Sequence, residues 1–309
     1  MMQINVAFCN RPSYDNPLGG DAIQMLKTKE WLEILYGIHI SIITHPNELT
    51  VNFNIVHVFN FATYEITNGF VEKAHQLGIP IISSCIYWDY SYSIPPLHYF
   101  MGYPSHIGKF SVLFYRFLYK NVTAFLKRPR GVSREFKKYT QKFIDYSHFI
   151  LPNSIEEGNL LLDFAGIKKA DKIRVVYNGV ELKDTQILPP ELFFSKYKLP
   201  KDYILQVGRI EYLKNQLNLL YALREHINIP IVFIGQISDA KYGKRLHEIA
   251  QKRGNVFFLN KVPHDEIASF YHYAALHVLL SLRESPGLVS MEAAAQGCPI
   301  VISTSEYLP

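Results

Sequence analysis

The chain has 309 residues, of which 48% are hydrophobic and 19% charged, so a mainly disordered state is excluded and two domains of roughly 150 residues each are expected. Its three cysteines, Cys9, Cys85 and Cys298, are too few and too scattered for a disulfide framework or a zinc site, which fits a reducing compartment. The net charge of +5 is small, and neither a secretion signal nor a run of 18 apolar residues is visible, so we expect a cytoplasmic protein without a membrane span.

Short β-branched runs alternate with helical patterns through the first part of the chain. Strands are predicted over residues 3–9, 38–44, 54–59, 79–84, 149–152 and 173–177. Apolar residues at helical spacing, such as Ala22, Met25 and Leu26, predict helices between most of these strands. Such an alternation is typical of a parallel sheet that helices cover on both faces.

A turn with two adjacent glycines follows the first predicted strand. It contains Gly19 and Gly20 and leads into the first predicted helix. Paired glycines would let the backbone approach a ligand, and a tight turn with positive φ would require them equally well. Neither the spacing of a dinucleotide fingerprint nor a P-loop occurs in the chain, so a dehydrogenase and a P-loop enzyme are disfavoured.

Residues 181–201 are predicted to link two domains, because the Pro-rich stretches at 188–190 and 199–200 are expected to break any regular element there. A second series of strands is predicted over residues 203–208, 229–235, 256–259, 276–280 and 299–303. The expected fold class is therefore α/β. It comprises two doubly wound, Rossmann-like parallel-sheet domains, residues 1–180 and 202–309, that face a cleft at the carboxyl ends of their strands.

The net positive charge of the chain comes from residues 109–142, which contain ten basic residues and one acidic residue. The rest of the chain is net acidic, which argues against a general nucleic-acid binder. On a helix, Lys109, Arg116, Lys120 and Lys127 would form one stripe beside aromatic and aliphatic residues. This stripe suits an anionic membrane surface, while a domain helix with a buried apolar face and surface lysines would explain it as well.

The clearest candidate for a binding site follows the predicted strand 276–280. Ser285 would cap a helix there, and Pro286 would occupy its first position. The N–H groups of Gly287, Leu288 and Val289 would then be unpaired at the positive end of the helix dipole. Such a helix start is a receptor for an anion, most often a phosphate.

Two carboxylates, Glu284 and Glu292, bracket this receptor and suit hydroxyl-rich groups on either side of the phosphate. A capped core helix with a surface glutamate at each end is the alternative interpretation. A second candidate group follows the predicted strand 203–208, where Gly208 and Arg209 precede Lys214. Cations at the carboxyl end of a strand could clamp a diphosphate, or could be solvated surface charges.

Together these motifs resemble the retaining glycosyltransferases of the GT-B fold, specifically family 4. The resemblance runs from about residue 3 to residue 303. It is carried by the Gly-Gly turn, by Val-Gly-Arg-x4-Lys at residues 207–214, by Asn-Gly-Val at 178–180 and by Glu-x7-Glu at 284–292. It implies that the second domain binds a nucleotide-diphosphate sugar and that the first binds a glycan or lipid-linked acceptor. The basic segment would then lie at the inner face of the membrane.

The resemblance also implies a role for each candidate residue. Arg209 and Lys214 would hold the diphosphate, Glu284 would contact the donor hexose and Glu292 the ribose hydroxyls. Gly20 would lie against the phosphate or the reacting sugar. The remaining members of the predicted nucleotide-sugar site are Gly208, Gly287, Leu288 and Val289. No cofactor is implied, and because the chain contains no Asp-x-Asp, we predict a reaction without a divalent metal.

The sequence departs from the family pattern in one place. Many members carry a His after the fourth strand that touches the donor sugar, and Ile86 stands there in this chain. Nearby polar candidates are His57, Tyr87, Asp89 and Tyr90. A non-catalytic nucleotide-sugar-binding protein or subunit, and a nucleotide-sugar epimerase, therefore stay open beside a hexose transferase that acts with retention. The family normally continues beyond the position of Pro309, so we also expect an incomplete chain.

Overall fold

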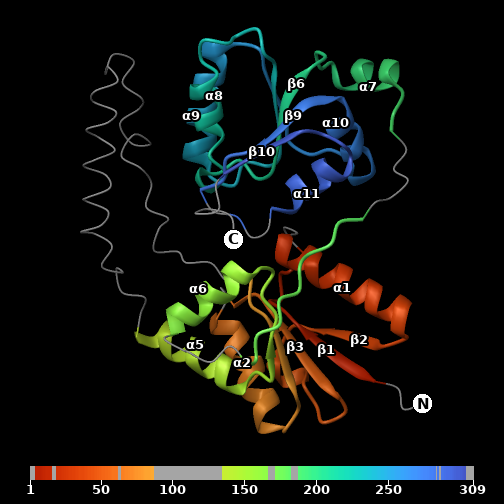
Figure 1. Ribbon diagram of the computed structural model, residues 1–309, viewed down its shortest axis with the longest axis vertical. Coiled ribbons are helices and arrows are strands. Elements are labelled where there is room, and N and C mark those ends of the chain that lie inside the picture. The colour runs from red at the N-terminus through yellow and green to blue at the C-terminus, as the bar shows by residue number, and fades with distance from the viewer. Residues whose placement is uncertain are drawn as a thin grey trace. The chain divides into compact units, whose positions relative to one another are not determined.

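The computed structural model describes residues 4–15, 19–61, 64–86, 134–165, 171–181, 187–282, 284 and 287–303 (Figure 1). The chain divides into two compact units, Met1–Tyr177 and Asn178–Pro309. Each unit contains one parallel sheet with helices around it, which confirms the predicted α/β class with two Rossmann-like domains. Much of the predicted basic segment, residues 109–133, lies outside the described residues, as do Tyr87, Asp89 and Tyr90.

Unit 1 contains a five-stranded parallel sheet with the strand order β2-β1-β3-β4-β5. The strands are β1 Asn5–Cys9, β2 His39–Ile43, β3 Ile55–Phe59, β4 Ile81–Ser84 and β5 Phe149–Ile150. The helices are α1 Gly20–Tyr36, α2 Tyr64–Gln76, α5 Arg134–Tyr146 and α6 Ile155–Ala165, with a 3-10 turn, η1, at Pro46–Glu48.

Helices cover the strands of unit 1 through two separate cores. Phe70, Phe143 and Leu161, from α2, α5 and α6, are buried with residues of the strands in one core. In the other, Met25 of α1 is buried with Phe8 of β1. This division explains why the strands are apolar along their whole length rather than at alternate positions.

Unit 2 repeats this plan with the strand order β10-β9-β6-β7-β8. Its strands are β6 Tyr203–Val207, β7 Ile231–Ile234, β8 Val256–Leu259, β9 Ala274–Leu279 and β10 Ile300–Ile302. Its helices are α7 Pro190–Tyr197, α8 Gln216–Ala222, α9 Ala240–Arg253, α10 Ile267–Tyr273 and α11 Leu288–Ala295. The 3-10 turns η4 Tyr212–Lys214 and η5 His264–Glu266 complete it.

The structure corrects two predicted features near the domain boundary. Helix α7 forms inside the segment predicted to be an irregular linker, because Pro189 and Pro190 occupy the start of the helix, where a fixed φ and a missing N–H cost nothing. Phe193 of this helix is completely buried in the core of unit 2. The predicted strand at 173–177 is reduced to an isolated bridge between Ile150 and Ile173, because its neighbour β5 is only two residues long.

In each sheet, successive strands are added on one side of the first strand and then, after one switch, on its other side. This switch lies between the neighbouring strands β1 and β3 in unit 1, and between β6 and β9 in unit 2. The connections that leave the carboxyl ends of two such strands go to opposite sides, which opens a crevice where ligands bind in folds of this type. In unit 2 the position where such a crevice is expected lies between the loops that follow β6 and β9.

Two glycines fix the loops beside this crevice. Gly208 follows β6 with φ 141°, and Gly235 follows β7 with φ 152°. A Cβ added to Gly235 would lie 2.0 Å from the carbonyl oxygen of Gly208, so no larger residue fits there without moving the backbone. The close approach of these two backbone segments fixes the position of Gly208, where the loop after β6 begins.

We predict that Gly235→Ala lowers the free energy of unfolding by roughly 3 kcal/mol or more, because the added methyl group would meet backbone atoms. Gly297→Ala is the matched control, since Gly297 has φ 74° but a Cβ there meets nothing within 4 Å. It should cost only about 1–2 kcal/mol from the backbone conformation. Urea unfolding of both variants measures the difference, and equal losses would contradict the close approach.

A histidine is buried in a central strand of each sheet. His57 in β3 bonds to Ser84 Oγ at 2.9 Å, and His277 in β9 bonds to Ser290 Oγ at 3.3 Å, each through Nε2. Burial lowers the pKa of His57 to about 3 and the pKa of His277 to about 4, from 6.5. His57 also stacks on Phe59, so this candidate polar residue is part of the core.

These shifts make stability depend on pH in a defined direction. Between pH 6.5 and about 4 the unfolded chain binds more protons than the folded one, so stability should fall as the pH falls through this window. His277→Gln removes one of the two groups and should make the midpoint of thermal unfolding less dependent on pH there. The exposed His272→Gln is the control. A wild-type slope in His277→Gln would contradict the assignment.

Candidate functional site

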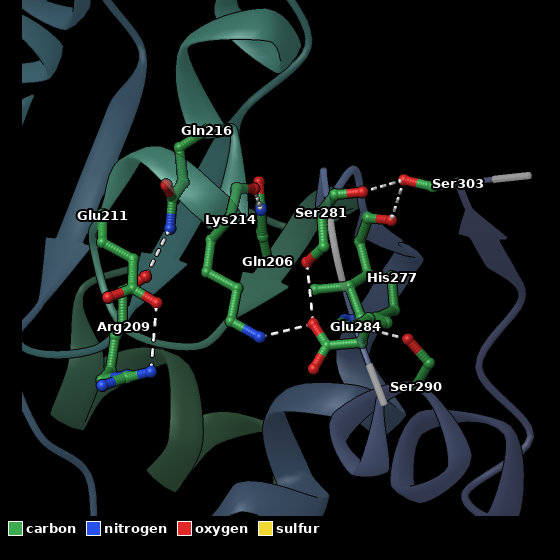
Figure 2. Close-up of polar contacts among 11 residues, drawn as sticks. Gln206, Arg209, Glu211, Lys214, Gln216, His277, Ser281, Glu284, Ser290 and Ser303 are labelled. Carbon is green, nitrogen blue, oxygen red and sulfur yellow. Dashed lines mark hydrogen bonds and ion pairs between the residues drawn. The ribbon is translucent and has the colours of Figure 1, made fainter. Parts of the chain in front are cut away.

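The loops that follow β6 and β9 lie side by side and carry most of the predicted site residues (Figure 2). After β6 the chain passes through Gly208 and Arg209 into η4, and after β9 it passes through Ser281 to α11. The N–H group of Leu282 donates to the carbonyl oxygen of Leu213 at 2.8 Å, which joins the two loops through their backbones.

Lys214 and Glu284, predicted as two separate ligands of a donor molecule, form an ion pair in which Lys214 Nζ donates to Glu284 Oε2 (Figure 2). The two side chains are only 16% and 12% exposed. Ser281 Oγ donates to the same carboxylate oxygen at 2.8 Å. Among the described residues, nothing bonds to Glu284 Oε1 or to the other two N–H groups of Lys214. The pair therefore keeps both a donor and an acceptor for a ligand.

Two buried glutamines hold the backbone that bears the cations. Gln206 Nε2 donates to the carbonyl oxygen of Lys214 at 2.7 Å, and Gln216 Nε2 donates to that of Arg209 at 2.8 Å. Both glutamines are 1% exposed. The ends of the loop are thus fixed from the interior of the unit, while the charged ends of the side chains stay outside.

The side chain of Arg209 is the more accessible cation. It is 60% exposed and pairs with Glu211 through Nη2 and Oε1 at 3.2 Å. Glu211 is only 15% exposed, but the guanidinium stands in solvent, which screens the attraction between the two charges. A phosphate could therefore compete with Glu211 for this guanidinium at little cost.

Helix α11 begins later than predicted, at Leu288, with Gly287 as its N-cap in a left-handed conformation at φ 74° and ψ 54°. Ser285 and Pro286, predicted as the cap and the first helical residue, lie outside the described residues. A Cβ at Gly287 would lie 3.0 Å from Glu284 Cγ, so the turn and the crowding both require glycine.

The N–H groups of this helix start are nevertheless available, as predicted. The first N–H bonded within the turn is that of Ser290, which donates to the carbonyl oxygen of Gly287 at 2.9 Å. No acceptor in the described part of the chain faces the N–H groups of Gly287, Leu288 or Val289. They form the positive end of an eight-residue helix.

Glu292 lies in the second turn of α11, and its carboxylate contacts α10. Tyr271 Oη donates to Glu292 Oε2 at 3.2 Å. Burial is the main reason that the pKa of Tyr271 is well above its usual value, so the phenol stays a donor. The structure therefore gives Glu292 a fixed partner that the sequence did not indicate.

Gly20 belongs to unit 1, where it is the first residue of α1. A Cβ added there would meet nothing within 4 Å, so the position is open. Beside it, Asp21 accepts a hydrogen bond from Asn60 Nδ2 at 2.8 Å and pairs with Arg11 at 3.3 Å. This polar group, which was not predicted, lies at the switch in strand order of unit 1, between β1 and β3.

Ile86, which the resemblance places at the position of a histidine, directly follows Cys85 after β4. Its φ is 45°, a left-handed conformation that is costly for a β-branched residue. The thiol of Cys85 donates to Glu157 Oε1 at 3.3 Å, so the backbone next to Ile86 is tied to the buried start of α6. The strain is thus located directly after β4, at Ile86 itself.

Within the described ranges, neither a cluster of metal ligands nor a membrane-spanning helix is present. No group of three or more His, Cys, Asp or Glu side chains there is arranged to hold a metal ion. None of the helices built from those residues has the length and apolar character needed to cross a membrane.

Two curated relatives align with about half of the chain. A D-inositol 3-phosphate glycosyltransferase of Streptomyces bingchenggensis is 30% identical over 178 residues, 52% of this chain and 38% of that protein. An uncharacterized glycosyltransferase of Methanocaldococcus jannaschii is 31% identical over 143 residues, 43% of this chain and 37% of that protein. The chain thus spans about two fifths of the length of these relatives.

Solved structures match nearly the whole chain. Anabaena HepE in complex with UDP and glucose has a TM-score of 0.67 at 14% identity, covering 97% of this chain and 80% of that one. Sucrose-phosphate synthase of Thermosynechococcus elongatus has a TM-score of 0.66 at 16% identity, covering 98% and 82%. The chain therefore has the GT-B fold, and its residues 190–309, which hold every predicted site residue except Gly20, match the family Glycosyl transferases group 1.

Proposed function

We propose that the chain is a retaining, family 4 glycosyltransferase that moves a hexose-type sugar from a nucleotide-diphosphate donor to a glycan or lipid-linked acceptor. The observation that carries the proposal is the Lys214–Glu284 pair beside the unpaired N–H groups at the start of α11. Both lie in the segment that matches Glycosyl transferases group 1. HepE structures with UDP and with UDP-glucose, which share the fold, give further support.

In this proposal the diphosphate of the donor lies against the start of α11. The N–H groups of Gly287, Leu288 and Val289 point to it from the positive end of the helix. Lys214 reaches it with the two N–H groups that Glu284 leaves free, and Arg209 turns to it from Glu211. Gly208 stands beside Lys214 with φ 141°, a conformation that favours glycine, while a Cβ there would only touch Lys214 Cδ and Cε at the ordinary contact distance of 3.8 Å.

The two carboxylates bind the sugars on either side of the diphosphate. Glu284 accepts a hydrogen bond from a hexose hydroxyl through Oε1, and Glu292 accepts from the ribose hydroxyls. Gly20 of unit 1, with open space around its α-carbon, lies against the phosphate or the reacting sugar.

The reaction breaks the bond between the anomeric carbon and the diphosphate oxygen, and the acceptor oxygen takes its place on the same face of the ring. Negative charge grows on the departing diphosphate, where Lys214, Arg209 and the helix start stabilise it. The departing oxygen takes the proton of the acceptor hydroxyl, so no side-chain base is required. The cations and the amide dipoles stabilise the negative charge that a divalent metal would otherwise stabilise.

The acceptor is a glycan or a lipid-linked molecule, held by unit 1. The basic segment 109–142 would keep the chain at the anionic inner face of a membrane on the cytoplasmic side. This part of the proposal rests on the charge pattern of the sequence alone.

A second candidate function is nucleotide-sugar binding without transfer, or epimerisation of the sugar. The strained Ile86, in place of a histidine that would touch the donor, favours it. Transfer releases nucleoside diphosphate and needs an acceptor. Epimerisation changes the sugar without an acceptor, and a pure binding protein does neither.

We predict that Lys214→Ala lowers the rate of nucleoside diphosphate release from a nucleotide sugar at least about 100-fold, because one stabilising donor is lost from the transition state. Glu284→Ala should lose transfer to a similar degree. Lys196→Ala is the matched control in the same unit, since it breaks the Lys196–Glu266 pair and should keep wild-type turnover. Wild-type turnover in Lys214→Ala, with thermal unfolding confirming a folded protein, would contradict the proposal.

A further inference from the structure

Ser281 is a buried serine beside the proposed donor site. It lies two residues beyond β9, its side chain is 1% exposed, and its Oγ donates to Glu284 Oε2 at 2.8 Å (Figure 2). No role was assigned to it from the sequence. The hydroxyl is thus a buried group whose partner is the carboxylate proposed to bind the hexose.

Ser281 and Lys214 both donate to Oε2 of Glu284. A glutamate side chain has three rotatable bonds, and a single ion pair leaves the plane of its carboxylate free to turn. A second donor at the same oxygen removes this freedom and keeps Oε1, which has no hydrogen-bond partner among the described residues, available as an acceptor. The geometry therefore selects which oxygen of Glu284 is presented.

The backbone around Ser281 is itself fixed. Ser303 Oγ donates to the carbonyl oxygen of Ser281 at 2.7 Å, and Ser303 N donates to that of Leu279 at 3.0 Å. The next residue, Leu282, is bonded to Leu213 in the loop after β6. These contacts use backbone groups and Ser303, so they remain when the hydroxyl of Ser281 is removed.

We infer that Ser281 is a positioning residue that orients Glu284 so that Oε1 accepts a hydrogen bond from the donor sugar. The inference rests on the proposed function. Without the hydroxyl, the carboxylate turns freely about its contact with Lys214, and binding of the hexose weakens. The diphosphate is bound by other groups, so its binding is unaffected. Ser281 thus acts on one part of the donor only.

The test measures dissociation constants for UDP-glucose and for UDP by calorimetry. Ser281→Ala should raise the constant for UDP-glucose about ten-fold, the usual effect of one hydrogen bond to a charged group, and change that for UDP less than about two-fold. In a Glu284→Ala background the same substitution should change neither. Ser281→Cys, which keeps the shape of the side chain with a somewhat larger, weakly donating sulfur, gives the same test if the alanine variant unfolds.

Ser269→Ala is the control for the loss of a buried hydroxyl elsewhere in unit 2, since Ser269 is also buried and accepts a hydrogen bond from Leu188 N at 2.9 Å, and it should leave both constants at wild-type values. Equal losses for UDP and UDP-glucose in Ser281→Ala would contradict the inference, as would an undiminished effect in the Glu284→Ala background. An equal effect of Ser269→Ala would contradict it as well. A wild-type chain that binds neither UDP nor UDP-glucose would overturn the proposed function itself.

Discussion

Lys214 reaches Glu284 because β6 and β9 are neighbours in the sheet, so the loops that follow them begin side by side. The switch in strand order lies between these two strands. This arrangement puts a cation from one loop, a carboxylate from the other and the start of α11 around one crevice. The two loops are then joined by a backbone hydrogen bond and supported from below by Gln206 and Gln216. The residues proposed to act on a donor therefore owe their proximity to strand order rather than to sequence distance.

The ion pair also resolves an electrostatic conflict. An unpaired carboxylate beside a bound diphosphate would repel it, while a sugar hydroxyl needs a carboxylate oxygen as acceptor. Pairing with Lys214 neutralises Glu284 and still leaves one oxygen open. At 16% and 12% exposure the pair is partly withdrawn from water, so the loss of one member would leave the other unpaired in a poorly solvated place.

The sequence predicted most of the fold, because near-continuous apolar strands and helical periodicity survive in any α/β protein. The predictions failed where the same residue type is compatible with two different local structures. The prolines at 189 and 190 were expected to break a regular element and instead begin α7. Ser285 and Pro286 have the features of a helix start, yet the left-handed Gly287 sets that start at Leu288. The sequence of these segments does not distinguish the two outcomes.

The sequence indicated which residues belong to the candidate site, but not which of them contact one another. Arg209, Lys214 and Glu284 were identified by type and position, whereas the pairing of Lys214 with Glu284 depends on which strands are neighbours. Ser281, Gln206 and Gln216 were missed because buried polar side chains leave no periodic signal. Their significance appears only once their partners are known.

The most direct test of the account is a calorimetric titration of the wild-type chain with UDP, once in EDTA and once in excess Mg²⁺. If amide dipoles and the two cations hold the diphosphate, UDP binds in EDTA, and its dissociation constant changes less than about two-fold when the metal is added. Binding that appears only with Mg²⁺, or no binding in either buffer, would contradict the account.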